Sequence, residues 1–427
     1  MRLLSGNPVA VSNRWEVVRD SFQLCHYGAP MPSVRRVALC MEYPITQWGG
    51  VEVLVKELVA GLASDFNLCL VSRDAPESLE ASGFSRHVIA HFPWDSEAPY
   101  RLQAGRLAEW LRDERVDLVH FHLGGTYAFR TRSWSQSPIP IVARTGIPCI
   151  ATNHGAFSLF DFCAPRRSTA FRLLMLPLAW AGRARTLAAL RSEITVSDND
   201  CANMRRWYPP FKSRFQRIYH SQLTGDEPAS AARDNTIFCL GTIGPRKGQT
   251  FLVRAFALIA ERFPDWTLHI AGRKDAGSRE VEEIERIIAA HGLRDRIRLL
   301  GAISPDEAAE RLRTCGVFAM PSLAEGLGLS LQEALVLGAP AVASNVGGIR
   351  DMIIPGQTGL LARAGSPEEL ASAMALLLGS ESLREALGRA ARERILALRM
   401  NRSAMLEEHR KLYTSILQPD ALSCVNH

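Results

Sequence analysis

The sequence lacks the cysteine pattern of a disulfide-linked or zinc-binding protein. Its nine cysteines are an odd number and are scattered without a CxxC pair, and several lie in apolar runs such as VALCM and IFCLG. We therefore expect reduced cysteines in the core, with neither a disulfide network nor a Cys-based zinc site. This usage also predicts a cytoplasmic location.

Long hydrophobic runs are missing as well. The longest uncharged stretch of membrane character covers residues 173–182, which is ten residues, whereas a spanning helix needs roughly 20. The first twenty residues contain no continuous apolar segment of the kind found in secretory signals. We expect a chain that neither crosses a bilayer nor is exported.

The chain also has no strong excess of one charge. Fifty Lys and Arg against 44 Asp and Glu leave a formal charge of +6 over 427 residues, which gives no reason to expect nucleic acid binding. With 47% hydrophobic and 22% charged residues, the composition is that of a globular protein and excludes a disordered or fibrous chain. At about 150 residues per domain, the length predicts two to three domains.

Short apolar runs alternate along the chain with segments of helical periodicity, which is typical of α/β proteins. The alternation begins near residue 34, stops at the polar segment 222–235, and restarts with TIFCLG. We expect two doubly wound, Rossmann-like parallel sheets facing across a cleft, with the ligand site at the carboxyl ends of the strands. The predicted parts are a poorly ordered extension (1–33), a first Rossmann-like domain (34–221), a linker (222–235), a second Rossmann-like domain (236–400), and a C-terminal helix and tail packing back on the N-terminal domain (401–427).

Residues 321–361 carry the most informative pattern, PSLAEGLGLSLQEALVLGAPAVASNVGGIRDMIIPGQTGLL. Glu325 and Glu333 are eight positions apart, as are Glu385 and Glu393, so the spacing alone means little. Only the first pair straddles a Gly-rich loop and a helix start, where free N–H groups can receive a phosphate or a sugar. Two plainer interpretations stay open: Glu333 closes a capping box with Ser330, and Glu325 is a solvated loop carboxylate.

This block resembles the donor-binding signature of retaining, nucleotide-sugar-dependent glycosyltransferases of the GT-B fold (group 1, family 4 type). It matches the family's PS-x-x-EG-x-G-L-x-x-x-EA core, its G-x-P-x-V-A-S strand and its GG-x-x-E/D turn. The glycine pair after Pro44, the TNHG segment at residues 152–155 and the loop GTIGPRKG at residues 241–248 are similar to further family motifs. The resemblance extends over about residues 36–417, and it implies that residues 34–221 form the acceptor-side domain and residues 236–400 the donor-binding domain.

The resemblance implies the function and the site residues. A sugar would pass from a nucleotide-diphosphate donor to a hydroxyl of a glycan or lipid-linked acceptor, with retention by same-face attack or through a covalent intermediate. No metal is expected, because Lys247, assisted by Arg246, would neutralise the leaving diphosphate. The implied catalytic residues are Glu325, His154 and Lys247. The implied donor-binding residues are Gly49, Gly50, Arg246, Gly326, Leu327, Gly328 and Glu333.

Three positions depart from the family pattern. Thr242 stands where many members carry a second cationic residue, a role that Arg246 can take. His220-Ser221 replaces a common Asn-Gly at the end of the acceptor domain, and Leu327 replaces an aromatic residue. These departures keep rival functions open: an epimerase or a phosphorylase on the same scaffold, or a glycan- or nucleotide-binding protein without activity.

Histidines near the predicted cleft allow two interpretations. The family pattern makes His154 a group that contacts the donor sugar, whereas an isolated histidine after a strand is more often structural. His120 and His122 alternate along a strand and point to one face. Burial near the cleft is the simpler account for these two, and metal binding is the alternative.

Residues 156–191 combine six arginines and one acidic residue with many apolar side chains. This mixture is typical of helices that lie on anionic membrane surfaces, so the protein would be peripheral on the inner face of the cytoplasmic membrane. A packed helical excursion with a solvated basic face is the equal alternative, with Pro165 and Pro177 expected to break any long helix. The candidate acceptor or membrane residues are Arg166, Arg167, Arg172 and Trp180.

Overall fold

The computed structural model describes most of the chain between residues 34 and 418. The described ranges are 34–41, 43–46, 49–95, 98–123, 137–155, 169–223, 233–275 and 277–418. The predicted extension, residues 1–33, and most of the predicted linker, residues 224–232, lie outside them.

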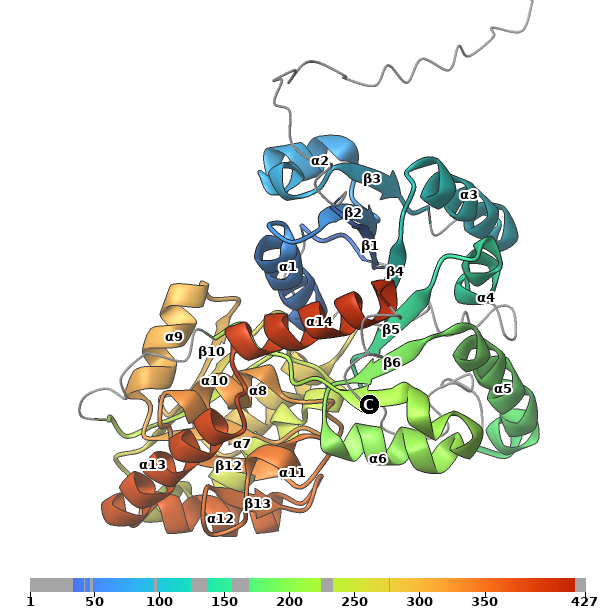
Figure 1. Ribbon diagram of the computed structural model, residues 1–427. Helices are drawn as coiled ribbons and strands as arrows, with labels where there is room; N and C mark the ends of the chain where they lie inside the picture. The colour runs from blue at the N-terminus through green and yellow to red at the C-terminus, as the bar shows by residue number, and fades with distance from the viewer. Residues whose placement is uncertain are drawn as a thin grey trace, which may run out of the picture. The chain divides into compact units, whose positions relative to one another are not determined.

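The first half of the described chain is built on a parallel sheet with the strand order β3-β2-β1-β4-β5-β6-β7 (Figure 1). Leu39 of β1 lies opposite Leu70 of β2 on one side and His120 of β4 on the other. The order therefore reverses between β1 and β4. The strands are β1 Arg36–Cys40, β2 Asn67–Ser72, β3 Ala90–Pro93, β4 Leu118–Leu123, β5 Cys149–Asn153, β6 Ser192–Thr195 and β7 Phe215–Arg217. The helices are α1 Gly50–Leu62, α2 Pro76–Ala81, α3 Tyr100–Asp113, α4 Ile139–Val142, α5 Thr169–Ala189 and α6 Asp198–Trp207.

The second half carries a parallel sheet with the order β10-β9-β8-β11-β12-β13, which reverses between β8 and β11. Two doubly wound, Rossmann-like sheets are thus present, as the sequence pattern predicts. The strands are β8 Thr236–Leu240, β9 Thr267–Ala271, β10 Ile297–Gly301, β11 Val317–Met320, β12 Ala341–Ser344 and β13 Leu360–Ala362. The helices are α7 Gln249–Ile259, α8 Glu280–Ala290, α9 Pro305–Thr314, α10 Leu329–Val336, α11 Ile349–Met352, α12 Pro367–Leu378, α13 Glu381–Ala397 and α14 Arg402–Leu417.

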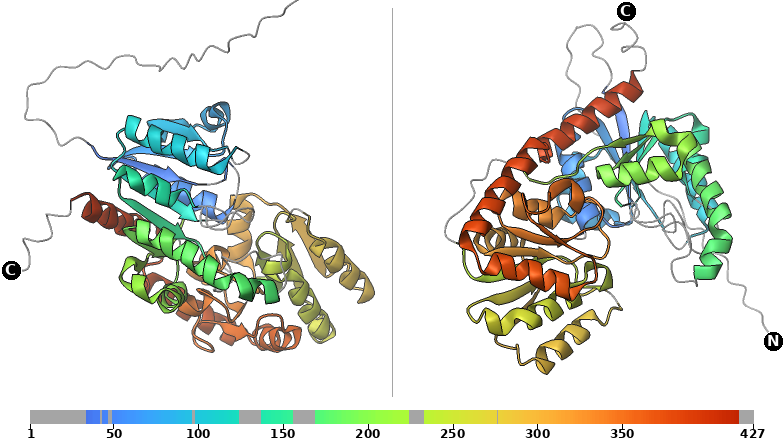
Figure 2. Two further views of the ribbon diagram at one scale, coloured as in Figure 1. Left: turned by 90° about the vertical axis from the view of Figure 1, so that its right-hand side faces the viewer. Right: turned by 90° about the horizontal axis from the view of Figure 1, so that it is seen from below.

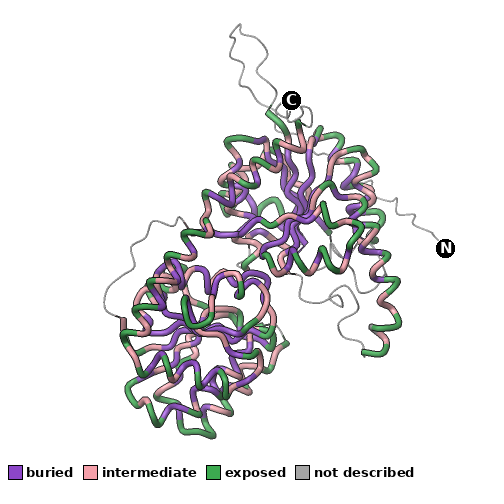
Figure 3. Tube along the Cα trace, turned by 60° about the horizontal axis from the view of Figure 1, so that its bottom comes forward, coloured by how far each residue is buried: buried purple, intermediate pink, exposed green. Residues whose placement is uncertain are grey.

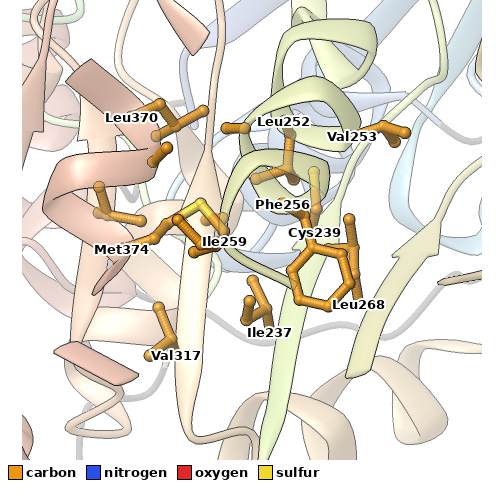
Figure 4. Packing of buried hydrophobic residues seen from close by; sticks show 14 of the residues in the cluster. Ile237, Cys239, Leu252, Val253, Phe256, Ile259, Leu268, Val317, Leu370 and Met374 are labelled. Atoms are coloured by element: carbon orange, nitrogen blue, oxygen red, sulfur yellow. The ribbon is translucent and has the colours of Figure 1, made fainter. Parts of the chain in front are cut away.

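Each sheet is held by helices that bury one apolar face. On α7, Leu252, Phe256 and Ile259 recur at three- and four-residue spacing and pack toward Ile237 of β8 and Leu268 of β9 (Figure 4). Inner strands such as β4 and β11 are buried throughout, and buried segments run through the interior of the trace (Figure 3). This packing fixes the strand ends from which the loops of the site emerge.

The C-terminal helix α14 packs against α1 of the first half (Figure 2). Arg402 forms an ion pair with Glu57, and Arg410 pairs with Asp65 at 2.8 Å. The buried Tyr413 hydroxyl lies 2.6 Å from Nδ1 of His120 on β4. These contacts join the end of the chain to its first sheet.

Helix α5 corrects one prediction about proline. It runs through 21 residues with Pro177 inside it, although Pro177 was expected to break a long helix. Proline removes one helical hydrogen bond, which costs least where the freed carbonyl can reach water. Leu173, four residues earlier, is 54% exposed, so its carbonyl lies on the exposed side of α5 and the helix continues.

Two further expectations can be compared with the described residues. The six described cysteines are free thiols in the core: Cys40, Cys69, Cys149, Cys201, Cys239 and Cys315. Within the same part of the chain, no helix combines the length and the apolar character that crossing a membrane requires.

Candidate active site

The loops that follow β8 and β11 bring opposite charges together. These strands are neighbours at the point where the order of the second sheet reverses, so their carboxyl ends lie side by side. Lys247 Nζ donates to both oxygens of Glu325, at 2.8 and 3.0 Å. Arg246 Nη1 donates to Glu325 Oε2 at 3.2 Å and to the carbonyl of Ala324 at 2.9 Å. Glu325 lies 79 positions after Arg246 and 78 positions after Lys247 in the sequence, yet the three side chains form one cluster of two cations and a carboxylate.

Glu325 is no solvated loop carboxylate. It is 7% exposed, whereas the side chain of Arg246 is 52% exposed and that of Lys247 is 18% exposed. A buried carboxylate is stable when cations and hydrogen bonds compensate its charge. The cluster can therefore present both positive charge and carboxylate oxygens to a ligand.

Glycines in the loop before α10 permit close backbone contacts. A Cβ on Gly326 would lie 2.2 Å from the carbonyl oxygen of His154, which belongs to the loop after β5. A Cβ on Gly347 would lie 1.7 Å from the carbonyl oxygen of Glu325, and Gly347 has a φ of +48°. Gly348 N–H donates to Gly326 O at 2.9 Å. The glycine turn after β12 therefore supports the Glu325–Gly326 backbone, which in turn reaches His154.

The start of α10 rules out the capping-box interpretation of Glu333. Gly328 occupies the N-cap with a φ of +91°, and no side chain caps the helix. Ser330 Oγ instead donates to the carbonyl of Leu240 at 2.9 Å, and Glu333 accepts a hydrogen bond from Gln222 Nε2. Because the sequence alternative assigned Ser330 and Glu333 to each other, that alternative is wrong.

Glu333 is a buried acid with an uncharged partner. Burial raises the pKa of its carboxyl to about 7, and the hydrogen bond from Gln222 opposes this shift. No ion pair to Glu333 is found among the described residues, in contrast to Glu325. Such a carboxyl can accept hydrogen bonds from ligand hydroxyls without a competing cation.

The predicted glycine pair lies beside this helix. Gly49 is the N-cap of α1 and Gly50 its first residue. A Cβ on Gly50 would lie 3.6 Å from Cδ1 of Leu329, the first residue of α10. Leu327, in place of an aromatic residue, is 4% exposed and belongs to a core cluster of the second half. The loops after β1 and β11 therefore approach each other.

His154 is fixed through both its ring and its backbone. Its Nε2 lies 3.2 Å from Nδ1 of His122 on β4. The side chain of Asn153 accepts the N–H of Gly155 at 3.2 Å and donates to Glu193 at 3.4 Å. Glu193 also forms a fully buried ion pair with Arg183 of α5. The loop after β5 is thus anchored on both sides of His154.

The other two departures from the family pattern, Thr242 and His220-Ser221, have definite contacts. The carbonyl of Thr242 accepts from Gln249 Nε2 at 3.1 Å, and the second cation at Glu325 comes from Arg246. The carbonyl of His220 accepts from Gln332 Nε2 at 3.0 Å, and Ser221 N–H lies 3.5 Å from the sulfur of Met405. The segment after β7 is therefore packed against α10 and α14.

The predicted acceptor or membrane residues do not form one described group. Arg166 and Arg167 lie outside the described residues, and of Arg172 only the helical backbone is described. Trp180 is half-buried and donates its indole N–H to the carbonyl of Trp207 at 2.9 Å. It therefore packs inside the helical layer. Exposed leucines lie on the first half of the same helix, namely Leu173 (54%), Leu174 (75%) and Leu178 (47%).

Sequence reasoning missed partners that depend on tertiary contact. Gln222 was assigned to the linker, yet it binds Glu333. Asp351 was noted only as part of a turn, yet its Oδ2 accepts the N–H of Asp198 at 2.6 Å, at the start of α6. Burial raises the pKa of Asp351, as does the charge of Asp198. The acid in the GG-x-x-D turn was the only available signal.

Comparison with known proteins shows which families the two halves match. Residues 48–220 match the profile of Glycosyltransferase Family 4, and residues 225–394 match that of Glycosyl transferases group 1. An uncharacterized glycosyltransferase of Methanocaldococcus jannaschii is 25% identical over 348 residues, 81% of this chain and 89% of that protein. The D-inositol 3-phosphate glycosyltransferase of Corynebacterium glutamicum is 33% identical over 151 residues, so this chain matches only 36% of its length.

A solved structure extends the comparison to the fold. The crystal structure of HepE from Anabaena in complex with UDP superimposes with a TM-score of 0.69 at 17% identity. The match covers 90% of this chain and 100% of that one.

Proposed function

We propose that this chain, which belongs to the group 1 glycosyltransferases and has their GT-B fold, transfers a hexose from a nucleotide-diphosphate sugar to a hydroxyl group with retention of configuration. The observation that carries the proposal is the cluster of Lys247, Arg246 and Glu325 at the strand-order reversal of the second sheet. Ligands of doubly wound sheets bind at this place. UDP in the HepE complex supports a nucleoside diphosphate as the leaving group.

In the proposed reaction, each charge in the cluster has a separate task. The bond between C1 of the sugar and the diphosphate breaks, and its electron pair leaves with the nucleotide. Lys247 and Arg246 stabilise that negative charge without a metal ion, as preorganised cations do at a developing anion. The acceptor oxygen forms the new bond to C1 on the same face, and its hydroxyl proton passes to an oxygen of the departing diphosphate.

The remaining residues hold the donor. Glu325 exchanges part of its contact with the two cations for the sugar hydroxyls, and the backbone of residues 326–328 lines the sugar. Glu333 accepts from the ribose hydroxyls, Gly49 and Gly50 leave room for the diphosphate, and His154 contacts the sugar from the first half. The acceptor is a glycan or a lipid-linked sugar.

Replacement of Lys247 by Ala tests the proposed leaving-group role. Release of nucleoside diphosphate should fall at least 100-fold, because removal of one preorganised donor to the developing charge typically costs 100- to 1,000-fold. Lys411→Ala is the matched control, since Lys411 is 60% exposed and pairs with Glu407 within α14. Equal rates for the two variants would refute the assignment.

The donor can be identified before any turnover is measured. UDP, GDP and ADP are added in turn, and thermal unfolding is recorded. A nucleotide at 100 times its dissociation constant should raise the unfolding free energy by about 2.7 kcal/mol. With the chosen donor alone, formation of a new sugar nucleotide without net release of nucleotide indicates an epimerase. Cleavage of a glycan by inorganic phosphate to a sugar 1-phosphate indicates a phosphorylase, and nucleotide binding without any product indicates an inactive binding protein.

We also propose that α5 attaches the protein to the anionic inner face of the cytoplasmic membrane. The exposed side chains of Leu173, Leu174 and Leu178 support this, because exposed leucines beside basic residues favour an interfacial helix. Pelleting with phosphatidylglycerol vesicles should be strong at low salt and weak at high salt. The Leu174→Ser variant should pellet less, whereas Leu258→Ser, at a leucine 61% exposed on α7, should not. Equal pelleting of both variants would contradict the proposal.

A further inference from the structure

Five histidine rings from separate parts of the first half and α14 touch one another in a closed circle. In order around the circle they are His120, His122, His154, His220 and His409, with centroid distances of 4.3, 5.4, 5.2, 5.9 and 5.8 Å. We call this group the histidine ring cluster. His154 is the member that the proposed function places against the donor sugar.

The cluster is uncharged at neutral pH. Burial lowers the pKa of all five imidazoles, and the neighbouring histidines lower those of His120, His122, His154 and His220 further. Each ring therefore carries one N–H and one lone pair. In the described part of the chain, no group of three or more His, Cys, Asp or Glu side chains is arranged to hold a metal ion.

His120 and His122 use their nitrogens differently. Both nitrogens of His120 are bonded, Nδ1 to the Tyr413 hydroxyl at 2.6 Å and Nε2 to Thr152 Oγ1 at 2.7 Å. His122 bonds through Nδ1 to Nε2 of His154 at 3.2 Å, and its buried Nε2 has no partner among the described residues. Because both rings are neutral, the hydrogen bond can form in two ways. Either His122 donates from Nδ1 to Nε2 of His154, or His154 donates from Nε2 to Nδ1 of His122.

The unpartnered nitrogen of His122 distinguishes these pairs. If His154 donated from Nε2, the proton of His122 would sit on the buried Nε2 and find no acceptor. If His122 donates from Nδ1, only a lone pair is left unpaired at that position. Buried N–H groups are left without a partner more rarely than buried acceptors. The second arrangement is therefore favoured.

From this geometry we infer that His122 is a positioning residue: it donates from Nδ1 to Nε2 of His154 and so fixes the proton of His154 on Nδ1. This inference rests on the proposed function, in which His154 faces the donor sugar. His154 then offers an N–H donor to a sugar oxygen, while Glu325 on the other half accepts from sugar hydroxyls. The contact between Gly326 and the His154 carbonyl keeps the two groups at one site.

Nitrogen NMR of the ligand-free protein tests the tautomer directly. Long-range correlation spectra of protein labelled with ¹⁵N-histidine distinguish Nδ1–H from Nε2–H rings, and His154→Gln assigns the resonance. We expect the Nδ1–H tautomer for His154 in the wild type and in His122→Asn, whose amide can still donate from the δ position. An Nε2–H signal for His154 in the wild type would overturn the inference.

Turnover separates positioning from packing. His122→Leu should lower kcat about tenfold, the loss expected when one hydrogen bond no longer aligns a group, with the KM for the donor unchanged. His122→Asn should retain kcat. Tyr413→Phe is the control within the cluster: it removes the bond to His120 and should lower the melting temperature but leave kcat unchanged. Equal loss of kcat in His122→Asn and His122→Leu would contradict positioning.

The proposed function can fail separately from this inference. If His154→Ala retains full kcat, the role of His154 at the sugar is refuted, whatever tautomer the NMR spectra show. If His154→Ala loses activity but its ring is Nε2–H in the wild type, only the role of His122 is refuted.

Discussion

Two buried glutamates of the site show how local partners decide the chemistry of one side-chain type. Glu325 has Lys247 and Arg246 as partners, so cations compensate its charge. Glu333 has the amide of Gln222, and burial raises its pKa to about 7. A carboxyl of the second kind destabilises the fold when it ionises, because its charge is then buried without a cation.

The Glu333→Gln variant should therefore change how unfolding depends on pH. In the unfolded chain the carboxyl loses its proton near its ordinary value of 4.5, and in the folded protein near 7. Between these values the folded state holds more protons, so the stability of the wild type falls as pH rises through this window and is lowest above 7. The glutamine variant does not titrate. We expect the free energy of unfolding of Glu333→Gln to exceed that of the wild type by up to about 3 kcal/mol at pH 8. At pH 4.5 the two values should differ little.

Urea unfolding of the nucleotide-free protein at both pH values measures this difference. Glu261→Gln, at an exposed position, controls for a change of net charge. If the free energies of unfolding of Glu333→Gln and the wild type changed with pH in parallel, the proposal that the Glu333 carboxyl is buried without charge would be wrong.

At the scale of elements, the sequence predicts what is local and misses what depends on distant partners. The alternation of apolar runs and helical segments predicts a helix over residues 305–314, and α9 has these bounds. The same alternation gives no signal for β3, whose four residues are only partly buried, or for β13, which has only three residues.

The candidate site shows the same difference between local signals and contacts to distant segments. The family resemblance of the Gly-rich motifs singles out Lys247 and Glu325 as candidates. The structure brings them together because loops after neighbouring parallel strands lie at one edge of the sheet. The partnership of Gln222 with Glu333 and that of His122 with His154 are set by the approach of distant segments. No spacing within the sequence encodes that approach.

Alanine substitutions at two glycines, one crowded and one open, test whether the close approach of the loop before α10 to His154 is needed for activity. Gly326→Ala should abolish nucleotide release with donor and acceptor, because its Cβ would meet the His154 carbonyl at 2.2 Å and push the loop away. Gly105→Ala lies inside α3, where a Cβ meets nothing within 4 Å. It should raise the unfolding free energy by about 0.5–1 kcal/mol through helix propensity and leave activity unchanged. A fully active Gly326→Ala variant would show that this close approach is not needed.

At the scale of the whole chain, a few specified contacts connect the two sheets. They include close approaches at glycine, as at Gly348, where an added Cβ would lie 2.8 Å from the Cβ of Ser197. They also include hydrogen bonds such as that from Gln332 to the carbonyl of His220, and the packing of Tyr219 into a core cluster of the second half. Such contacts are sensitive to the exact position of the loops. A donor bound as proposed, between loops of both halves, would act on the same contacts that join them.

Asp351 provides the sharpest test of this connection. Its carboxylate belongs to the second half and accepts the N–H of Asp198 at the N-terminus of α6, where negative charge is favourable. Asp351→Ala should lower the unfolding free energy by about 1 kcal/mol and speed hydrogen exchange in the first turn of α6. Exchange in α3, which lies elsewhere in the first half, should not change. The exposed Asp295→Ala variant controls for the loss of one charge. If the amide of Asp198 exchanges as slowly in Asp351→Ala as in that control, the carboxylate does not connect the halves. The start of α6 would then be held by Ser197 alone, whose Oγ accepts the N–H of Asp200 at 3.1 Å.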